Sequence, residues 1–197
     1  MTWVLIAVLG AIAAWNGWNY WQRQQALQAA ALFDELERVV PTQDLDRIQR
    51  VWSDIQAHAP ATIQAQHAGL LVAKAAVEAT HLDVARQALQ TVISKSKDEA
   101  LTAVARLRLA GIELDQGQLD AAASVLATAV PAEFEALQAD RLGDLYAMRN
   151  QADEARQSYQ KAWSLMAGEL EYRRLIEAKL NTLGVNPNES STQEPAR

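Results

Sequence analysis

The chain begins with a stretch of apolar residues that has no charged face. Thr2 to Trp21 reads TWVLIAVLGAIAAWNGWNYW and contains no Asp, Glu, Lys, Arg or His. As a helix, such a stretch extends about 30 Å, which is the thickness of the hydrocarbon core of a bilayer. The pattern therefore predicts a transmembrane anchor over residues 1–21.

Aromatic residues stand at both ends of this stretch. Rings with a polar edge gather where the apolar core of a membrane meets the headgroups. The candidate membrane-anchor residues are therefore Trp3, Trp15, Trp18, Tyr20 and Trp21.

Two other interpretations of the stretch remain. A cleaved signal peptide could use the small residues of Ala11-Ile12-Ala13, but the stretch lacks a basic start. A buried helix of a soluble protein would have to hide Trp rings around its whole circumference. The charges near the stretch set no firm orientation, because only Arg23 follows it closely. A short cytosolic segment before Met1 is also compatible with this arrangement.

From Gln22 onward the apolar residues are spaced three and four apart, which is typical of helices with one buried face. The first of these helices continues out of the apolar stretch and stops at Pro41, and the next one ends before Pro60. Thr42 is the expected N-cap of the second helix. Residues 22–60 are therefore predicted as connecting and N-terminal packing helices.

Residues 61–183 repeat a helical-hairpin pattern with a period of about 34 residues. If the copies are numbered from Gln66, Ala103 and Ala136, the twentieth position is always Ala, and the intervals between these alanines are 37 and 33 residues. Tetratricopeptide repeats have small residues at positions 8 and 20 and a larger one at position 24. The residues at positions 8, 20, 24 and 27 are Ala73, Ala85, Leu89 and Val92, then Ala110, Ala122, Leu126 and Ala129, then Gly143, Ala155, Tyr159 and Ala162.

Small residues let two antiparallel helices approach, and a hairpin that cannot bury its own apolar stripe must stack on a neighbour. The predicted fold class is therefore all-α: a single N-terminal transmembrane helix followed by a tetratricopeptide-like helical-hairpin solenoid. Three degenerate repeats and a closing helix, residues 169–183, occupy 61–183. Residues 184–197 have the composition of a disordered tail.

The composition removes several functional classes. The chain has no Cys, which excludes disulfide scaffolds, thiolate metal sites and cysteine nucleophiles. Its 18 basic and 24 acidic residues give a net charge of −6, which argues against nucleic acid as a partner. No catalytic or phosphate-binding motif is present. His58, His67 and His81 lack the spacing of a metal site, so neither a cofactor nor a metal is expected and the chain is not predicted to be an enzyme.

The inner face of stacked hairpins is the candidate partner-binding surface. Grooves of such repeats display positions 2, 5, 9, 12 and 13 of each copy. Here these are His67, Leu70, Lys74, Val77 and Glu78, then Val104, Leu107, Gly111, Leu114 and Asp115, then Leu137, Asp140, Asp144, Ala147 and Met148. An aliphatic strip with acidic residues suits an apolar helix or an unfolded segment. The candidate partner-binding residues are Leu70, Lys74, Val77, Val104, Leu107, Leu114, Leu137 and Met148. Alternatively, residues 44–58 or 169–183 of the protein itself fill the strip.

The order of these parts resembles the YfgM family, the ancillary subunit of the bacterial SecYEG translocon. The resemblance rests on the anchor ending in Gly17-Trp18-Asn19-Tyr20-Trp21, the following helix with Ala29-Ala30-Ala31-Leu32-Phe33, and the three degenerate hairpins. It implies a single-pass protein of the inner membrane with its C-terminal domain in the periplasm. The implied partners are the SecYEG translocon and a membrane-anchored peptidyl-prolyl isomerase-like chaperone. The family normally has a cytosolic tail before the anchor, and here none precedes the apolar stretch.

The predicted function is therefore a membrane-anchored periplasmic protein-binding module that links the translocon to chaperones during protein export and meets emerging polypeptides. The alternative is an anchored scaffold or assembly factor for another envelope complex, such as cytochrome maturation or outer-membrane assembly.

Overall fold

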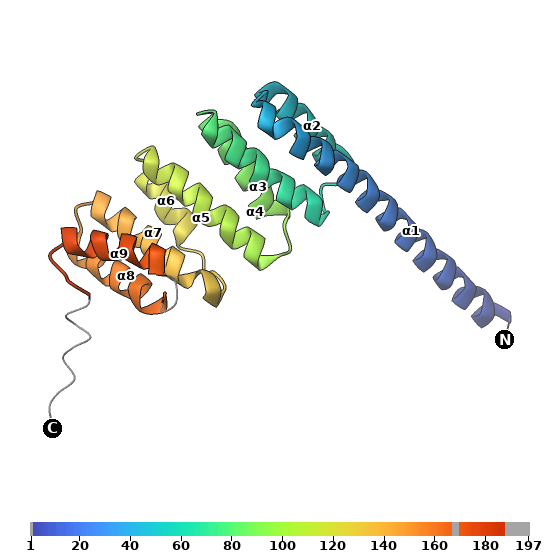
Figure 1. Cartoon of the computed structure of the whole chain (residues 1–197). Helices are drawn as coiled ribbons and strands as arrows, with labels where there is room; N and C mark the ends of the chain where they lie inside the picture. The colour runs from blue at the N-terminus through green and yellow to red at the C-terminus, as the bar shows by residue number, and fades with distance from the viewer. Residues whose placement is uncertain (1, 167–169, 188–197) are drawn as a thin grey trace. The chain divides into compact units, whose positions relative to one another are not determined.

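The computed structural model describes residues 2–166 and 170–187, and within them it contains helices joined by short turns and no β-strand (Figure 1). The predicted all-α fold is thus confirmed. The helices are α1 (Thr2–Val39), η1 (Val40–Thr42), α2 (Leu45–His58), α3 (Ile63–Glu78), α4 (Leu82–Lys95), α5 (Glu99–Asp115), α6 (Leu119–Leu126), η2 (Ala132–Phe134), α7 (Glu135–Met148), α8 (Ala152–Leu165) and α9 (Leu170–Thr182). They form two compact units, which we call unit 1 (Met1–Ser96) and unit 2 (Lys97–Arg197).

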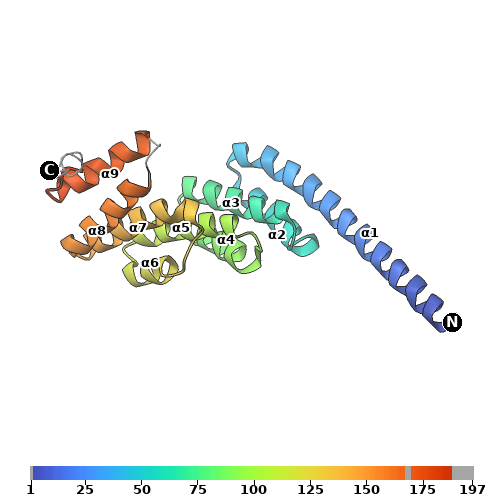
Figure 2. The same ribbon diagram turned by 90° about the horizontal axis from the view of Figure 1, so that it is seen from below.

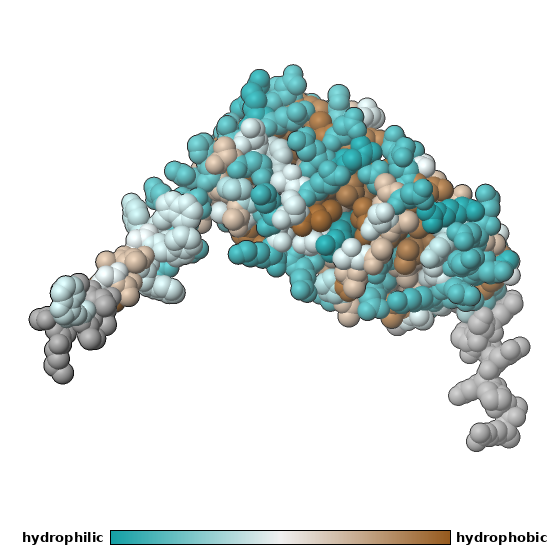
Figure 3. All heavy atoms as spheres, turned by 180° about the vertical axis from the view of Figure 1, so that it is seen from behind, coloured by the Kyte–Doolittle hydropathy of each residue, from teal (hydrophilic) through white to brown (hydrophobic). Residues whose placement is uncertain are grey.

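The first half of α1 extends past the rest of unit 1 (Figure 1). The five candidate anchor residues are all more than half exposed, and the first buried side chain described in α1 is Ala29. This part of the surface is pale to brown, without the deep teal that covers most of the hairpins (Figure 3). Within the described part of the chain, no helix combines the length and the apolar character that crossing a membrane requires, so the expected transmembrane helix is not confirmed.

The second half of α1 packs against α2 and α3. The helix ends at Val39, just before Pro41, as the sequence predicts. The expected N-cap of α2 is wrong by two residues: Asp44, not Thr42, caps α2, because its Oδ1 accepts a hydrogen bond from the backbone N–H of Arg47 at 3.0 Å. Thr42 lies in η1 and donates its hydroxyl to the carbonyl of Val39.

The three hairpins turn in the same way. At position 15 of each copy the backbone is left-handed, with φ of 62° at Thr80, 69° at Gly117 and 60° at Asn150. The next residue in each turn donates its N–H to the carbonyl five residues earlier, at 2.8, 2.8 and 2.9 Å. These bonds satisfy the carbonyls at the end of the first helix. The repeated pattern in the sequence therefore corresponds to a repeated backbone geometry.

The paired helices approach closely at the small positions. Ala85, Ala122 and Ala155 at position 20 are all completely buried. Gly143 at position 8 lies against the ring of Tyr159, so that a Cβ there would come within 2.8 Å of Cζ and closer still to the ring edge. The small residues thus have the packing role that their spacing predicts.

The second hairpin departs from the pattern. Its second helix, α6, ends at Leu126, so Ala129 lies beyond the helix and is exposed, which is a correction to its expected place at position 27. Gln138 of α7 donates its Nε2 to the carbonyls of Leu126 and Thr128, each at 2.8 Å. This amide satisfies carbonyls that the short helix leaves without a helical partner.

In unit 2, α9 follows the last hairpin and packs against α8 (Figure 2). Its buried residues Ile176 and Leu180 join a core cluster with Ala155, Tyr159 and Ala162. After α9, Gly184 has a φ of 77°, and Val185 packs against the same cluster. The rest of the expected disordered tail, 188–197, lies outside the described residues.

Candidate functional site

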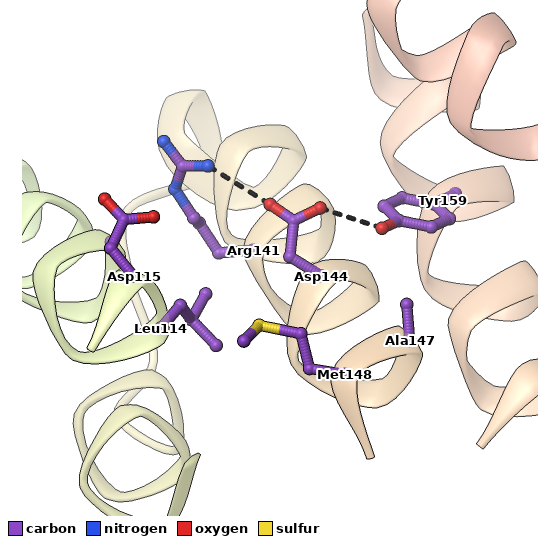
Figure 4. A pocket seen from close by; sticks show the side chains of 8 residues that line it. Leu114, Asp115, Arg141, Asp144, Ala147, Met148 and Tyr159 are labelled. Carbon is purple, nitrogen blue, oxygen red and sulfur yellow. Dashed lines mark hydrogen bonds and ion pairs between the residues drawn. The ribbon is translucent and has the colours of Figure 1, made fainter. Parts of the chain in front are cut away.

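A pocket of about 290 Å³ opens in unit 2 between α5 and α7, and Tyr159 reaches it from α8, on the other side of α7 (Figure 4). It is lined by Gly111, Leu114, Asp115, Arg141, Asp144, Ala147, Met148 and Tyr159. Six of these eight residues occupy positions 9, 12 and 13 of the second and third copies, where the sequence places a groove. The structure therefore brings together the groove positions of α5 and α7.

Asp144 is the centre of the polar wall of the pocket. Its Oδ1 accepts a hydrogen bond from the hydroxyl of Tyr159 at 2.8 Å and pairs with Nζ of Lys179 at 2.6 Å. Its Oδ2 accepts from Nη1 of Arg141 at 3.1 Å (Figure 4). Asp144 thus has a partner on α7, on α8 and on α9, and its carboxylate is fixed in position.

Beneath this wall, Asp140 is 0% exposed and is the buried end of the same network. Its two oxygens are taken by α9: Tyr172 donates its hydroxyl to Oδ2 at 2.8 Å, and Lys179 donates to Oδ1 at 2.7 Å. A buried carboxylate is tolerated only when it is paired and hydrogen-bonded in this way. The two aspartates of α7 are thus linked to α9 through Tyr172 and Lys179.

The environment of the two tyrosines keeps them as hydrogen-bond donors. Burial raises the pKa of Tyr159 strongly above its ordinary value, and the hydrogen bond to Asp144 raises it further. Burial and then the hydrogen bond to Asp140 raise the pKa of Tyr172 in the same direction. Both hydroxyls therefore stay protonated over the whole physiological range of pH.

The other wall and the floor of the pocket have a different character. Asp115 is the last residue of α5, is exposed, and makes no ion pair or hydrogen bond through its carboxylate with the described residues. Leu114 is buried in the apolar floor, whereas Ala147 and Met148 are exposed, Met148 to 47%. The pocket therefore combines an apolar floor with the paired charges of Arg141 and Asp144 on one side and the carboxylate of Asp115 on the other.

The remaining candidate partner-binding residues of unit 2 lie outside this pocket. Leu107 is buried in a core cluster with Leu114 and Leu145. Leu137 is half-buried and packs against both core clusters of unit 2, and Val104 is half-buried on α5. Among the third-copy groove positions, α9 covers Asp140 and leaves Ala147 and Met148 open, so one of the protein's own helices occupies part of the predicted strip.

In unit 1, the candidate residues lie along α3. Leu70 is nearly buried, Val77 is 42% exposed, and Lys74 is exposed and pairs with Glu78 at 3.8 Å. A smaller pocket of about 180 Å³ is lined by residues of α2, α3 and the turn that precedes α2. No residue of this set carries a buried charge.

Four residues of the unit 2 network were not among the groove positions named from the sequence: Arg141, Tyr159, Tyr172 and Lys179. The sequence did contain a signal for them. Asp140 and Asp144 are one helical turn apart on the face predicted as an aliphatic strip with acidic residues, and like charges at that spacing slightly destabilise a helix. A nearby basic residue would relieve this repulsion, although its position does not follow from the spacing. In residues 2–166 and 170–187 no group of three or more His, Asp and Glu side chains is arranged to hold a metal ion.

Comparisons with known proteins agree with this architecture. A family model described as "Tetratricopeptide repeat-like domain" matches residues 1–185. The chain is 31% identical over 180 residues to a protein of Neisseria gonorrhoeae named "Ancillary SecYEG translocon subunit", covering 91% of this chain and 86% of that protein. A protein of the same name from Haemophilus influenzae is 30% identical over 175 residues, covering 89% and 84%. A third, from Aggregatibacter actinomycetemcomitans, is 34% identical over 111 residues, covering 56% and 53%. No solved structure matches the chain.

Proposed function

We propose that this protein is a protein-binding subunit of the Sec translocon, because the chain belongs to the YfgM family of ancillary SecYEG translocon subunits and has a tetratricopeptide repeat-like domain. The observation that carries the proposal is the similarity to two relatives of that name over about nine tenths of the chain. The open pocket of unit 2, built from groove positions of two repeats, supports protein binding rather than catalysis.

The proposal includes attachment to the inner membrane through the first half of α1, with both units on the periplasmic side. The attachment is supported by the absence of charge in Thr2 to Trp21 and by the exposed aromatic residues at both ends of that stretch. Large exposed apolar surfaces mark contacts with membranes or proteins. Confinement to a membrane raises the local concentration of the binding surface, so modest affinity gives frequent contact with partners.

In this scheme the partners are the translocon itself, a membrane-anchored peptidyl-prolyl isomerase-like chaperone, and emerging polypeptides. Affinity isolation of the full chain in mild detergent tests the assignment. SecYEG subunits should co-purify. Recovery of a cytochrome-maturation or outer-membrane assembly complex instead, without SecYEG, would overturn it.

Photocrosslinking in cells tests which surface makes the contact. A crosslinker in place of Met148, which is exposed at the pocket, should capture translocon subunits, the chaperone or exported chains. The control is Leu165, which is 48% exposed on α8 and does not line the pocket. Equal capture from both positions would place the binding surface elsewhere.

Topology and attachment form a separate test. Protease added to spheroplasts should digest the units beyond Gln22, and the undigested protein should stay in the membrane fraction after alkaline carbonate washing. Full protection from protease would place the units in the cytosol and contradict the periplasmic part of the proposal.

A further inference from the structure

The α2–α3 turn, residues 59–62, lies beside the point where the apolar half of α1 leaves unit 1. The Nε2 of Gln25 donates a hydrogen bond to the carbonyl of His58, the last residue of α2, at 3.3 Å. Gln25 is one helical turn past Trp21, so the end of α2 stands about 6 Å further along α1 than the aromatic end of the apolar stretch. Both ribbon views show the turn on the side of unit 1 toward which the first half of α1 extends (Figure 1, Figure 2).

The side chains that this turn exposes are apolar. Ala61 is exposed in the turn itself, and Ile63, the first residue of α3, is 48% exposed. With Trp21 at the edge of the hydrocarbon core, as in the proposed attachment, the lipid headgroups occupy about 5–7 Å beyond it. Ile63 is therefore within reach of the headgroup region.

Acidic residues are nearly absent from this end of unit 1. The sequence contains no Asp, Glu, Lys or Arg between Asp54 and Lys74, a stretch that holds the last turn of α2, the α2–α3 turn and most of α3. Asp54 itself lies one helical turn before the end of α2. The other acidic residues of unit 1 lie toward its opposite end: Asp34, Glu35, Glu37, Asp44, Asp46, Glu78 and Asp83. A negatively charged bilayer surface therefore repels this end less than the other one.

The helix ends on this side have charges that anionic headgroups attract. In α2 and in α4 to α9 an acidic residue stands in the first turn, whereas α3 has none there. The positive end of the α3 dipole is therefore not offset by a carboxylate in its own first turn. Helix α4 runs antiparallel to α3 and ends on this side with Lys95, and Arg23 of α1 lies just before Gln25.

We propose that the α2–α3 turn is a second contact of this protein with the membrane, in which Ile63 enters the headgroup region of an anionic lipid bilayer. Lys95 and the N-terminus of α3 then face lipid phosphates, and unit 1 rests on the bilayer beside the apolar half of α1. The contact determines how α1 is tilted against the bilayer and thereby which way unit 1 faces. This inference rests on the proposed attachment through α1 and adds to it a lipid-binding surface.

The composition of the turn favours lipid over a protein partner. Protein interfaces are anchored by Trp, Tyr and Arg side chains in well-packed pockets. None of these residues occurs between Asp54 and Lys74. A single exposed Ile among small uncharged residues needs only the shallow apolar layer that the surface of a bilayer offers. The turn also adjoins the stretch that the proposed attachment already places in lipid.

The test uses single-Cys variants of the full chain, which has no Cys of its own, so that each variant carries one label. Ile63→Cys, labelled with the dye NBD, is reconstituted into vesicles of phosphatidylethanolamine and phosphatidylglycerol that contain a lipid spin-labelled at its headgroup. The spin label should quench the dye at position 63 several-fold more than a dye on Val77→Cys. Val77 is the matched control, because it is 42% exposed on the same helix but about 21 Å further from the turn.

A charge placed in the turn locates the contact. Ala61→Asp in the labelled Ile63→Cys chain should lower the quenching to the level seen at Val77, because headgroup phosphates repel a carboxylate and its dehydration is costly. The control is Gln43→Asp, which adds the same charge to the exposed turn at the opposite end of α2 and should leave the quenching unchanged. Replacing phosphatidylglycerol by phosphatidylcholine should weaken the quenching, because the attraction of anionic headgroups to Lys95 is then lost.

Equal quenching at Ile63 and Val77 overturns the proposal, as does quenching that persists in Ala61→Asp or that does not depend on phosphatidylglycerol. It is also overturned if the dye at position 63 is unquenched in pure lipid while a crosslinker there captures a protein in native membranes. A dye on Leu9→Cys, in the apolar half of α1, separates these failures from a failure of the attachment. Quenching at Leu9 by a spin label within the acyl chains, without quenching at Ile63, refutes this inference alone. No quenching at Leu9 refutes the attachment on which it rests, and co-purification with SecYEG still tests the translocon assignment by itself.

Discussion

Helix α2 precedes the hairpin of unit 1, and helix α9 follows the hairpins of unit 2. The side chains with which these two helices pack on their neighbours differ. In unit 1, α2 buries Ile48, Val51 and Ile55, and the one buried polar side chain described in that unit is Gln66, which donates to the carbonyl of Pro60 at 3.0 Å. In unit 2, α9 buries Ile176 and Leu180 but also closes an ionic network over the completely buried Asp140.

The difference shows what α2 and α9 each contribute to their unit. Apolar packing supplies stability that depends on shape and area and accepts many similar side chains. A buried ion pair supplies little net stability relative to apolar packing but penalises any arrangement that leaves one charge unpaired. The network of unit 2 therefore fixes the position of α9 and also orients Arg141 at the pocket, which the apolar contacts of unit 1 have no means to do.

The largest expected effect comes from removing the cation of the network. Lys179→Met keeps the apolar stem but leaves Asp140 buried beside one remaining donor, Tyr172. The free energy of opening α9 should fall by about 3 kcal/mol, as when one partner of a buried pair is lost. Hydrogen exchange of the α9 amides measures it.

Lys161→Met on α8 is the matched control, because Lys161 pairs with Glu135 at 3.5 Å on the surface and its side chain is 60% exposed. That pair should be worth less than about 0.5 kcal/mol. A similar small loss for Lys179→Met would show that the network does not hold α9. Adding Asp140→Asn to Lys179→Met should recover part of the loss, because no buried charge then remains.

The second largest effect comes from the close contact between α7 and α8 at Gly143. Gly143→Ala would press a Cβ into the ring of Tyr159, whose hydroxyl is tied to Asp144, so the ring cannot turn away without breaking that bond. We expect a loss of about 2 kcal/mol in the free energy of unfolding of unit 2, measured by urea denaturation.

Two other helical glycines serve as comparisons. Gly69→Ala in unit 1 meets a methyl group of Val92 and the edge of Trp52, at 2.5 and 3.0 Å, neither of which is tied by a hydrogen bond, so its loss should be about half as large. Gly111→Ala meets nothing closer than 3.9 Å and should stabilise α5 by about 0.5–1 kcal/mol through helix propensity. Equal effects at Gly143 and Gly111 would contradict the close packing.

The third effect is a loss of stability at alkaline pH, which we expect in unit 2 because that unit holds the buried tyrosines. Because burial and the bond to Asp144 raise the pKa of Tyr159 in the folded state, the unfolded chain loses this proton at a lower pH than the folded one. The stability that Tyr159 contributes in this way is fully present below the pKa of the unfolded chain, near 10. As the pH rises above that value, the free energy of unfolding falls by about 1.4 kcal/mol per pH unit.

Denaturation of wild type and Tyr159→Phe between pH 8 and about 11 measures this slope. The difference between the two proteins removes the contribution of the lysines, which titrate in the same range. Parallel curves for the two proteins would mean that Tyr159 ionises equally easily in both states.

The repeated parts of the fold could be predicted from the sequence, because local spacing determines them. Ala85, Ala122 and Ala155 are small wherever two helices meet, and Pro41 and Pro60 mark helix ends that the structure retains. The early end of α6 was missed because Ala129 fits the spacing. The backbone leaves the helix after Leu126, and Gln138 bonds the carbonyls of Leu126 and Thr128.

The candidate site could be predicted only in part. Positions 9, 12 and 13 of two copies gave most of the pocket lining, because they depend on helix geometry alone. The exposure of each side chain does not follow from that geometry: Leu107 and Leu114 are buried in a core cluster, whereas Met148 at the end of α7 is exposed. The partners of Asp140 come from a helix more than thirty residues away in the chain, and no local pattern specifies such a pairing.

The smallest expected effect tests whether the hairpin turns of the two units are equivalent. Thr80, Gly117 and Asn150 hold the same left-handed backbone at position 15, but a β-branched residue is the costliest of the three there. Thr80→Gly should therefore stabilise unit 1 by about 0.5–1 kcal/mol, because relief of the steric cost exceeds the added chain entropy of glycine. Asn150→Gly is the matched change in unit 2 and should gain less, since Asn tolerates this conformation. Thermal unfolding of both variants measures the two gains, and a loss of stability in Thr80→Gly would mean that the turns of the two units are not equivalent.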